Sequence, residues 1–255
     1  MKLEEFNYDL PKELIAQEPA EPRDSCRLMM VDKKTGEWEH HHFRDILDEI
    51  REGDVFVFNN TKVIPARLYG KKRDTGGKVE MLLLTPKGND TWEVLVNPGR
   101  KALPGVEIEF AENCYCKVLD KTEFGGRLVE FHYDGNFDSL LDQIGEMPTP
   151  PYIHKKLGNN DEYQTVYAKY KGSAAAPTAG LHFTPELMEE MKKKGAKLLF
   201  VTLHVGIGTF RPVSEENIED HEMHKEWYTV SEETAKDVNY ATDEGRLVIA
   251  VGTTS

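Results

Sequence analysis

The middle of the chain, residues 63–134, holds six short apolar stretches with no helical pattern between them. Clusters rich in Gly, Asp, Asn and Lys separate these stretches and are typical of turns. Short strands that follow one another this closely close into a small barrel or pack as a sandwich. A short helical pattern over residues 136–145 follows. We therefore predict a small all-β, barrel-like domain, which we bound at residues 63–144.

Both flanks of this domain alternate strand and helix patterns. Residues 27–42 predict a hairpin, and residues 55–60 predict a buried strand. Residues 43–53 place apolar side chains on one helical face and end at a glycine. Thr184 and Ser231 each precede a helical pattern and are typical N-caps. The predicted fold class is therefore α/β, a mixed α/β main domain with an inserted barrel-like domain. The main domain is expected to comprise residues 1–62 and 145–255.

The composition restricts where such a chain works. None of the 255 residues belongs to an apolar run of eighteen, so the sequence predicts no membrane span. The first residues are acidic and polar, unlike a signal peptide. Cys26, Cys114 and Cys116 are too few and too poorly spaced for a disulfide framework. We therefore expect a cytoplasmic protein with reduced thiols, and a monomer.

The charge is unevenly distributed. A net charge of −13 argues at first against nucleic acid, since phosphate binding requires Lys and Arg. Residues 61–134, however, hold 12 Lys and Arg against 11 Asp and Glu, so all of the excess acid lies elsewhere. A locally basic face therefore remains compatible with the sequence.

Two loops rich in small residues each contain a histidine. In AAAPTAGLHF, residues 174–183, a Thr-Ala-Gly run before a helix leaves backbone N–H groups open to a polar ligand. His182 can exchange a proton near neutral pH. In LHVGIGTF, residues 203–210, two glycines follow a strand, where ligands of α/β folds gather. A tight loop with a hydrogen-bonded core histidine explains the first stretch equally well. No dinucleotide or NTP fingerprint is present.

Two more histidines, His221 and His224, suggest a different chemistry. His221, His224 and Glu226 combine residue types that bind zinc, but their spacing differs from the His-Glu-x-x-His motif. A metal-dependent hydrolase is therefore an alternative interpretation that requires a bound metal.

Tyrosines and lysines alternate over residues 152–171. Tyrosines stack on unpaired bases and lysines contact phosphates, which is the pattern of an RNA-binding surface. A helix with inward tyrosines and solvated lysines is the structural alternative. A non-catalytic RNA-binding module would use this stretch but would leave both histidine loops without a purpose.

Nine motifs in order along nearly the whole chain closely resemble the S-adenosylmethionine:tRNA ribosyltransferase-isomerase family of queuosine biosynthesis. They are YDLPKELIAQEP, RDSCRL, FNNTKVIPARL, MPTPPYI, YQTVYA, AAAPTAGLHF, VTLHVGIGTFRPV, HEMHKE and VIAVGTTS. The resemblance implies transfer of the ribosyl moiety of S-adenosylmethionine onto 7-aminomethyl-7-deazaguanine at the tRNA wobble position. Epoxyqueuosine forms, and adenine and methionine are released. S-adenosylmethionine is a consumed co-substrate, so the resemblance implies no cofactor and no metal.

This chemistry requires general bases, because an aminomethyl group and a carbon beside the sulfonium must lose protons. The candidate catalytic residues are His182, His204, His221 and His224, with His182 preferred as the base. The candidate substrate-binding residues include aromatic faces for the sulfonium. They are Thr178, Ala179, Gly180, Phe183, Gly206, Gly208, Thr209 and Phe210. We expect a Gly180→Val variant to lose turnover without unfolding.

The resemblance also favours the basic and tyrosine-rich stretches as the tRNA surface. The candidate RNA-binding residues are Lys62, Arg67, Lys71, Lys72, Arg73, Tyr152, Lys155, Lys156, Tyr163, Tyr167, Lys169 and Lys171. Members of the family continue well past the final GTTS, so an inactive, C-terminally truncated form is a further alternative.

Overall fold

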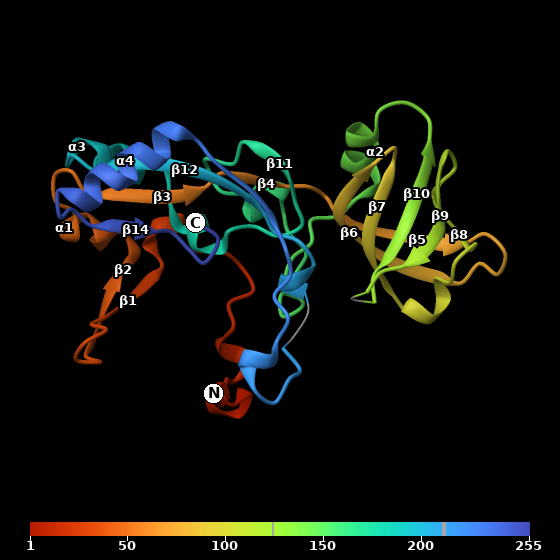
Figure 1. The fold of residues 1–255 in the computed structure, drawn as a ribbon, viewed down its shortest axis with the longest axis horizontal. Helices are drawn as coiled ribbons and strands as arrows, with labels where there is room; N and C mark the ends of the chain where they lie inside the picture. Colours follow the sequence, from red (N-terminus) through yellow and green to blue (C-terminus); the bar gives the residue numbers. More distant parts are fainter. Residues whose placement is uncertain (124, 211–212) are drawn as a thin grey trace.

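A four-stranded sheet forms the centre of the main α/β part (Figure 1). The computed structural model describes residues 1–123, 125–210 and 213–255. In the sheet, β3 (Val55–Asn59) runs parallel to both β12 (Lys197–His204) and β14 (Val248–Ala250). The edge strand β13 (Trp227–Val230) is antiparallel to β12. The carboxyl ends of three parallel strands therefore meet at one edge of the sheet.

Helices cover both faces of this sheet, because β3 is buried at every position, Val55–Phe58 are apolar, and alternate side chains point to opposite faces. Phe56 and Phe58 pack in the cluster that contains α3 (Pro185–Lys193). Val55 and Val57 pack in the cluster that contains α4 (Glu232–Asp243). The predicted caps are confirmed: Thr184 and Ser231 accept hydrogen bonds from Leu187 and Thr234 N–H at 3.1 Å.

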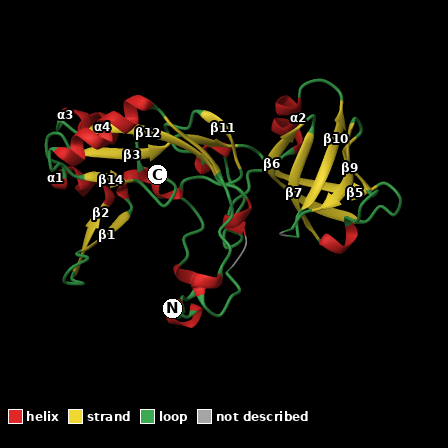
Figure 2. Cartoon of the chain, in the orientation of Figure 1, coloured by secondary structure: helices red, strands yellow, loops and turns green. Residues whose placement is uncertain are grey.

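Six antiparallel strands form a closed barrel, in the order β10-β7-β6-β5-β8-β9 (Figures 1 and 2). The α/β fold class with a small barrel is therefore confirmed. Gly70 is required by the closure, since a Cβ there would lie 2.7 Å from the Glu109 carbonyl oxygen. Helix α2 (Phe137–Ile144) packs Leu141 on the barrel core. The strands are β5 (Arg67–Lys72), β6 (Lys78–Gly88), β7 (Thr91–Asn97), β8 (Glu107–Ala111), β9 (Cys114–Lys121) and β10 (Arg127–Tyr133).

Two smaller β-structures complete the fold. Strands β1 (Arg27–Val31) and β2 (Trp38–His42) form the predicted hairpin, which projects from the main part (Figure 1). Strand β4 (Thr61–Val63) pairs in parallel with β11 (Tyr170–Ser173). Short 3₁₀ turns occur at Leu3–Phe6, Lys12–Leu14, Arg23–Ser25, Phe43–Asp45, Gly99–Lys101, Asn160–Tyr163, Thr178–His182, Ile207–Phe210 and Ile218–Asp220.

The helix predicted over residues 43–53 is shorter in the structure. It consists of one 3₁₀ turn followed by α1 (Ile46–Glu49), and Ile50 is already extended. The buried Asp54 carboxylate accepts a hydrogen bond from Arg51 N–H at 2.9 Å and so stabilises a turn in place of the last helical residues. No helix in the described ranges combines the length and apolarity needed to cross a membrane.

Candidate functional site

One cavity lies where β11, β12 and β14 end, and we call it the glycine-loop cavity. Its volume is about 430 Å³, and its walls include residues 175–179, Thr209, Phe210 and residues 252–254. The carboxyl ends of parallel strands are the usual ligand site of open α/β sheets. The cavity therefore unites Thr178, Ala179, Thr209 and Phe210, four of the eight predicted substrate-binding residues.

Ser173 joins the two loops that form this cavity. Its buried hydroxyl donates to the Ala175 carbonyl at 2.7 Å and accepts from Val205 N–H at 3.0 Å. A direct backbone bond of 3.0 Å from Ala174 N–H to the Val205 carbonyl adds a second link. Sequence reasoning missed Ser173, because a serine among alanines gives no pattern that predicts a link between distant loops.

A second cavity adjoins the first, and we call it the histidine cavity. It has a volume of about 350 Å³ and is walled by residues 16–20, Arg23, Leu181 and His182, among others. The two cavities share Pro150, Tyr152, Tyr163 and Thr178. A ligand that crosses this common wall would contact both loops that the sequence identified.

His182 is half-buried in the histidine cavity. Its Nδ1 lies 3.1 Å from the Cys26 thiol, and its ring packs 5.1 Å from the ring of Phe43. Burial lowers the pKa of His182, and the positive charge of Arg23 lowers it further. The imidazole is therefore neutral near pH 7, which is the state that a general base requires.

His204 lies away from the walls of both cavities. Its Nδ1 is 2.7 Å from the Thr61 hydroxyl, and its ring stacks on Trp227 at 4.9 Å. A Cβ at Gly172 would lie 2.8 Å from its Nε2, so backbone closes the other side. Burial lowers the pKa of His204 as well. This environment matches the structural alternative, a packed and hydrogen-bonded histidine.

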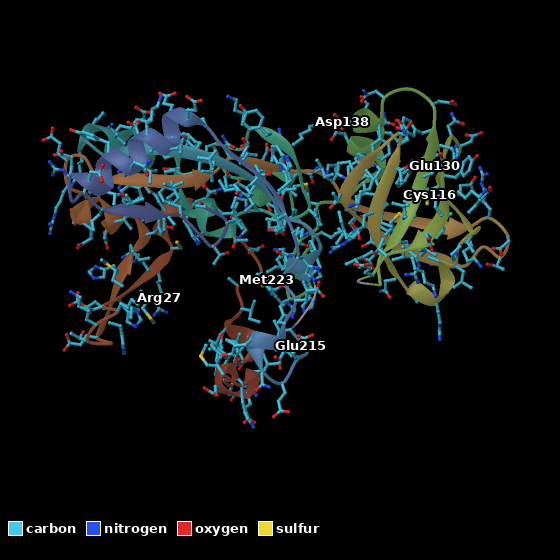
Figure 3. The ribbon with its side chains drawn as sticks, viewed as in Figure 1. Arg27, Cys116, Glu130, Asp138, Glu215 and Met223 are labelled. Carbon is cyan, nitrogen blue, oxygen red and sulfur yellow. The ribbon has the colours of Figure 1, made fainter. Side chains whose placement is uncertain are left out.

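His221 and His224 lie together on a segment beside the N-terminus (Figure 3 labels Glu215 and Met223 there). His221 Nδ1 is 2.8 Å from Glu215 Oε2, and this bond is the main reason that the pKa of Glu215 falls to about 2. Glu226 instead accepts from Gly206 N–H at 2.8 Å. Within the described ranges, no three His, Cys, Asp or Glu side chains cluster as metal ligands would.

Three predicted substrate contacts occupy other environments. Phe183 is 2% exposed and packs edge-on against Phe43 and Phe58, so its prediction as a sulfonium contact is wrong. A Cβ at Gly180 would lie 1.9 Å from the Tyr167 hydroxyl, so a valine there would disrupt packing, contrary to our expectation. Gly208 lies against His224, where an added Cβ would be 3.3 Å from Cδ2.

The candidate RNA-binding tyrosines differ in exposure. Tyr152 is 52% exposed at the common wall of the two cavities. Tyr163 is buried, and Tyr167 packs against Phe58 and Phe200 with its pKa raised by burial. The Tyr163 ring is not available to stack on an RNA base, so that prediction is wrong, and the half-buried Tyr167 ring packs against the core of the main part. The irregular backbone of this stretch points them inward.

Three candidate RNA-binding cations line one depression of about 360 Å³. They are Arg67 from the barrel and Lys155 and Lys156 from the main part. Each has a carboxylate partner, namely Glu80, Glu18 and Glu146. Lys72, Arg73 and Lys171 also pair with carboxylates, whereas Lys62, Lys71 and Lys169 form no ion pair with any described residue.

A larger, open depression of about 840 Å³ lies on the barrel. Tyr69, Lys71 and Glu109 are among its walls, and no residue of the two histidine loops contributes to it. The barrel thiols are inert, since burial raises the pKa of Cys114 to about 11 and that of Cys116 further (Figure 3). We therefore assign the chemistry to the two adjoining cavities of the main part.

Comparison with known proteins identifies the family of the chain. A family model described as queuosine biosynthesis protein matches residues 3–255. S-adenosylmethionine:tRNA ribosyltransferase-isomerases from Thermoanaerobacter sp. and Clostridioides difficile are 57% and 54% identical to the chain. Each match covers the whole chain and 75% of the relative. A crystal structure of the S-adenosylmethionine tRNA ribosyltransferase of Thermotoga maritima is 36% identical and covers 96% of this chain and 68% of that one, with a TM-score of 0.43. The chain therefore belongs to the queuosine biosynthesis family of ribosyltransferase-isomerases and is a transferase.

Proposed function

We propose that the chain transfers the ribosyl moiety of S-adenosylmethionine onto 7-aminomethyl-7-deazaguanine at the wobble position of tRNA. The product is epoxyqueuosine, and adenine and methionine are released. The names of the relatives at 53–57% identity support the two substrates. The modified base and the product come from the resemblance of the sequence motifs.

The observation that carries the proposal is the meeting of two predicted loops around one cavity. Thr178 and Ala179 face Thr209 and Phe210 across a space of about 430 Å³. This volume lies in the usual range for small-ligand sites. Small side chains and short loops leave backbone groups accessible, as recognition of a ribose and a base requires. We propose that the nucleoside part of S-adenosylmethionine binds here.

His182 is the proposed general base. Its Nδ1 is engaged with Cys26, so Nε2 is the nitrogen left to accept a proton. Burial and the charge of Arg23 keep the ring neutral. The histidine lies just beyond the wall that the two cavities share, beside Thr178. This position suits removal of the acidic proton on the carbon next to the sulfonium.

The tRNA is proposed to approach across the depression between barrel and main part. Lys155 and Lys156 line this depression, and the exposed Tyr152 precedes them in the chain. An unpaired wobble base that stacks on Tyr152 would reach the common wall of both cavities. On tRNA binding, Lys155 must then leave Glu18 and Lys156 must leave Glu146, and each lysine must pair with a phosphate instead.

The test is an incubation with S-adenosylmethionine and tRNA that carries 7-aminomethyl-7-deazaguanine. Mass spectrometry of the digested tRNA and an adenine assay follow the two products independently. We expect epoxyqueuosine and adenine in equal amounts from the wild type. A His182→Gln variant should form both products far more slowly than the wild type. A His132→Gln variant, altered on the barrel surface, should form them at the wild-type rate. Equal rates for all three proteins would refute the role of His182.

A further inference from the structure

The histidine cavity contains a cation with no anionic partner. Arg23 donates through Nη1 to the Gln164 carbonyl at 2.6 Å and through Nη2 to the Asp161 carbonyl at 2.7 Å. No carboxylate of the described residues lies within ion-pair distance of this guanidinium. Two of its five N–H groups hold the side chain in place, so three remain for a ligand. Arginine in this state recognises carboxylates strongly.

An anion with no cationic partner lines the same cavity. Glu162 is half-buried and accepts a single hydrogen bond of 3.3 Å from Gly158 N–H. Within the described ranges it forms no ion pair, whereas Glu18, also in the wall, is paired with Lys155. The cavity therefore presents one open positive group and one open negative group.

The remaining walls are largely apolar and well supported. Ile153, Leu157 and Leu181 line the cavity. The Gln17 side chain connects the two segments that form these walls, residues 16–20 and 149–157. It donates to the Tyr152 carbonyl at 3.0 Å and accepts from His154 N–H at 2.7 Å. Separated opposite charges on apolar walls are complementary to an α-amino acid zwitterion with an apolar side chain.

We propose that the histidine cavity binds the methionyl part of S-adenosylmethionine. Arg23 binds the α-carboxylate, Glu162 binds the α-ammonium, and the aliphatic chain lies against Leu157 and Leu181. This assignment rests on the proposed function, which supplies the substrate. The sulfonium then lies at the common wall, where the exposed ring of Tyr152 offers the aromatic face that a cation prefers. Methionine, released in the reaction, would leave through this cavity.

The test uses ligands that lack one charge, so that the wild-type protein suffices. Calorimetry is performed with methionine, with 4-(methylthio)butanoate, which lacks the ammonium, and with 3-(methylthio)propylamine, which lacks the carboxylate. Methionine should bind at least about tenfold more tightly than either analogue, since hydrogen bonds to charged groups are each worth about that factor. Equal binding of all three, or no binding of millimolar methionine, would overturn the proposal.

Variants assign the two charges to residues. Glu162→Gln should weaken methionine binding at least about tenfold and leave the binding of 4-(methylthio)butanoate, which lacks the ammonium, unchanged. Arg23→Lys should weaken methionine binding likewise and leave the binding of 3-(methylthio)propylamine, which lacks the carboxylate, unchanged. Glu189→Gln and Arg44→Lys, which lie outside the cavity, serve as matched controls. Adenine release with tRNA is measured in parallel. If adenine is released but the three ligands bind equally, the methionyl subsite is overturned and the proposed function is not. If methionine binds more tightly than both analogues but no adenine is released, the result counts against the proposed function and leaves the subsite standing.

Discussion

Substitution of Gly180 tests whether the loop of residues 174–183, which contains His182, is held in place by packing against Tyr167. An alanine Cβ would lie 1.9 Å from the Tyr167 hydroxyl and 3.0 Å from Thr165 Cγ2 and from Tyr167 Cζ. The tyrosine ring cannot withdraw easily, because it packs 5.0 Å from Phe58 and 5.8 Å from Phe200. Overpacking of this kind costs about 1–3 kcal/mol. We therefore expect Gly180→Ala to lower the free energy of unfolding by that amount.

Tyr167→Phe provides the compensating change. The Tyr167 hydroxyl is buried and has no hydrogen-bond partner among the described residues, so its removal should cost little or even stabilise the protein. It also removes the 1.9 Å contact and leaves only contacts near 3.0 Å. The double variant should therefore recover at least roughly half of the stability lost in Gly180→Ala.

Urea denaturation of the four proteins, without substrates, gives the coupling energy directly. Gly77→Ala is the matched control, since its Cβ would find nothing closer than 3.5 Å, and it should unfold like the wild type. Gly180→Ala with wild-type stability would refute the packing argument. So would a double variant no more stable than Gly180→Ala.

Four further predictions concern the site and the RNA surface. Ser173→Ala should lower the free energy of unfolding by about 1–3 kcal/mol, because the buried Val205 N–H and Ala175 carbonyl lose their partner. Urea denaturation checks this, and an unchanged midpoint contradicts it. His182→Gln should reduce turnover about 10²–10⁴-fold. In the wild type, kcat/KM should fall as the pH drops, with a midpoint below the ordinary histidine pKa of 6.5, because burial and Arg23 lower that of His182. A midpoint above 6.5 would contradict this assignment. Lys156→Ala should reduce the slope of log tRNA affinity against log salt by about one, with the exposed Lys193→Ala as control. Equal slopes would exclude Lys156 from the RNA surface.

The elements of the fold were largely predictable, because each depends on local pattern. Short apolar stretches between turn clusters predict the six barrel strands, and Thr184 followed by Pro185 predicts the start of α3. The failure at residues 43–53 shows the limit of this reasoning. There the helical pattern continues, but the Asp54 side chain bonds the backbone and ends the helix early.

The site was only partly predictable, because its geometry depends on contacts between distant segments. The small residues of both loops indicated a ligand, and four of them line one cavity. Nothing local distinguishes His182, in a cavity wall, from His204, which is enclosed by Thr61, Trp227 and Gly172. Likewise, the irregular backbone near Tyr163 has no period that would indicate its inward direction.

The central claim is that S-adenosylmethionine binds across the common wall of the two adjoining cavities. A crystal structure of the protein with bound S-adenosylmethionine tests it most directly. The account predicts adenosine density in the glycine-loop cavity, between Thr178 and Thr209, and methionyl density beside Arg23. Density in the barrel depression near Tyr69, with both cavities empty, would contradict it.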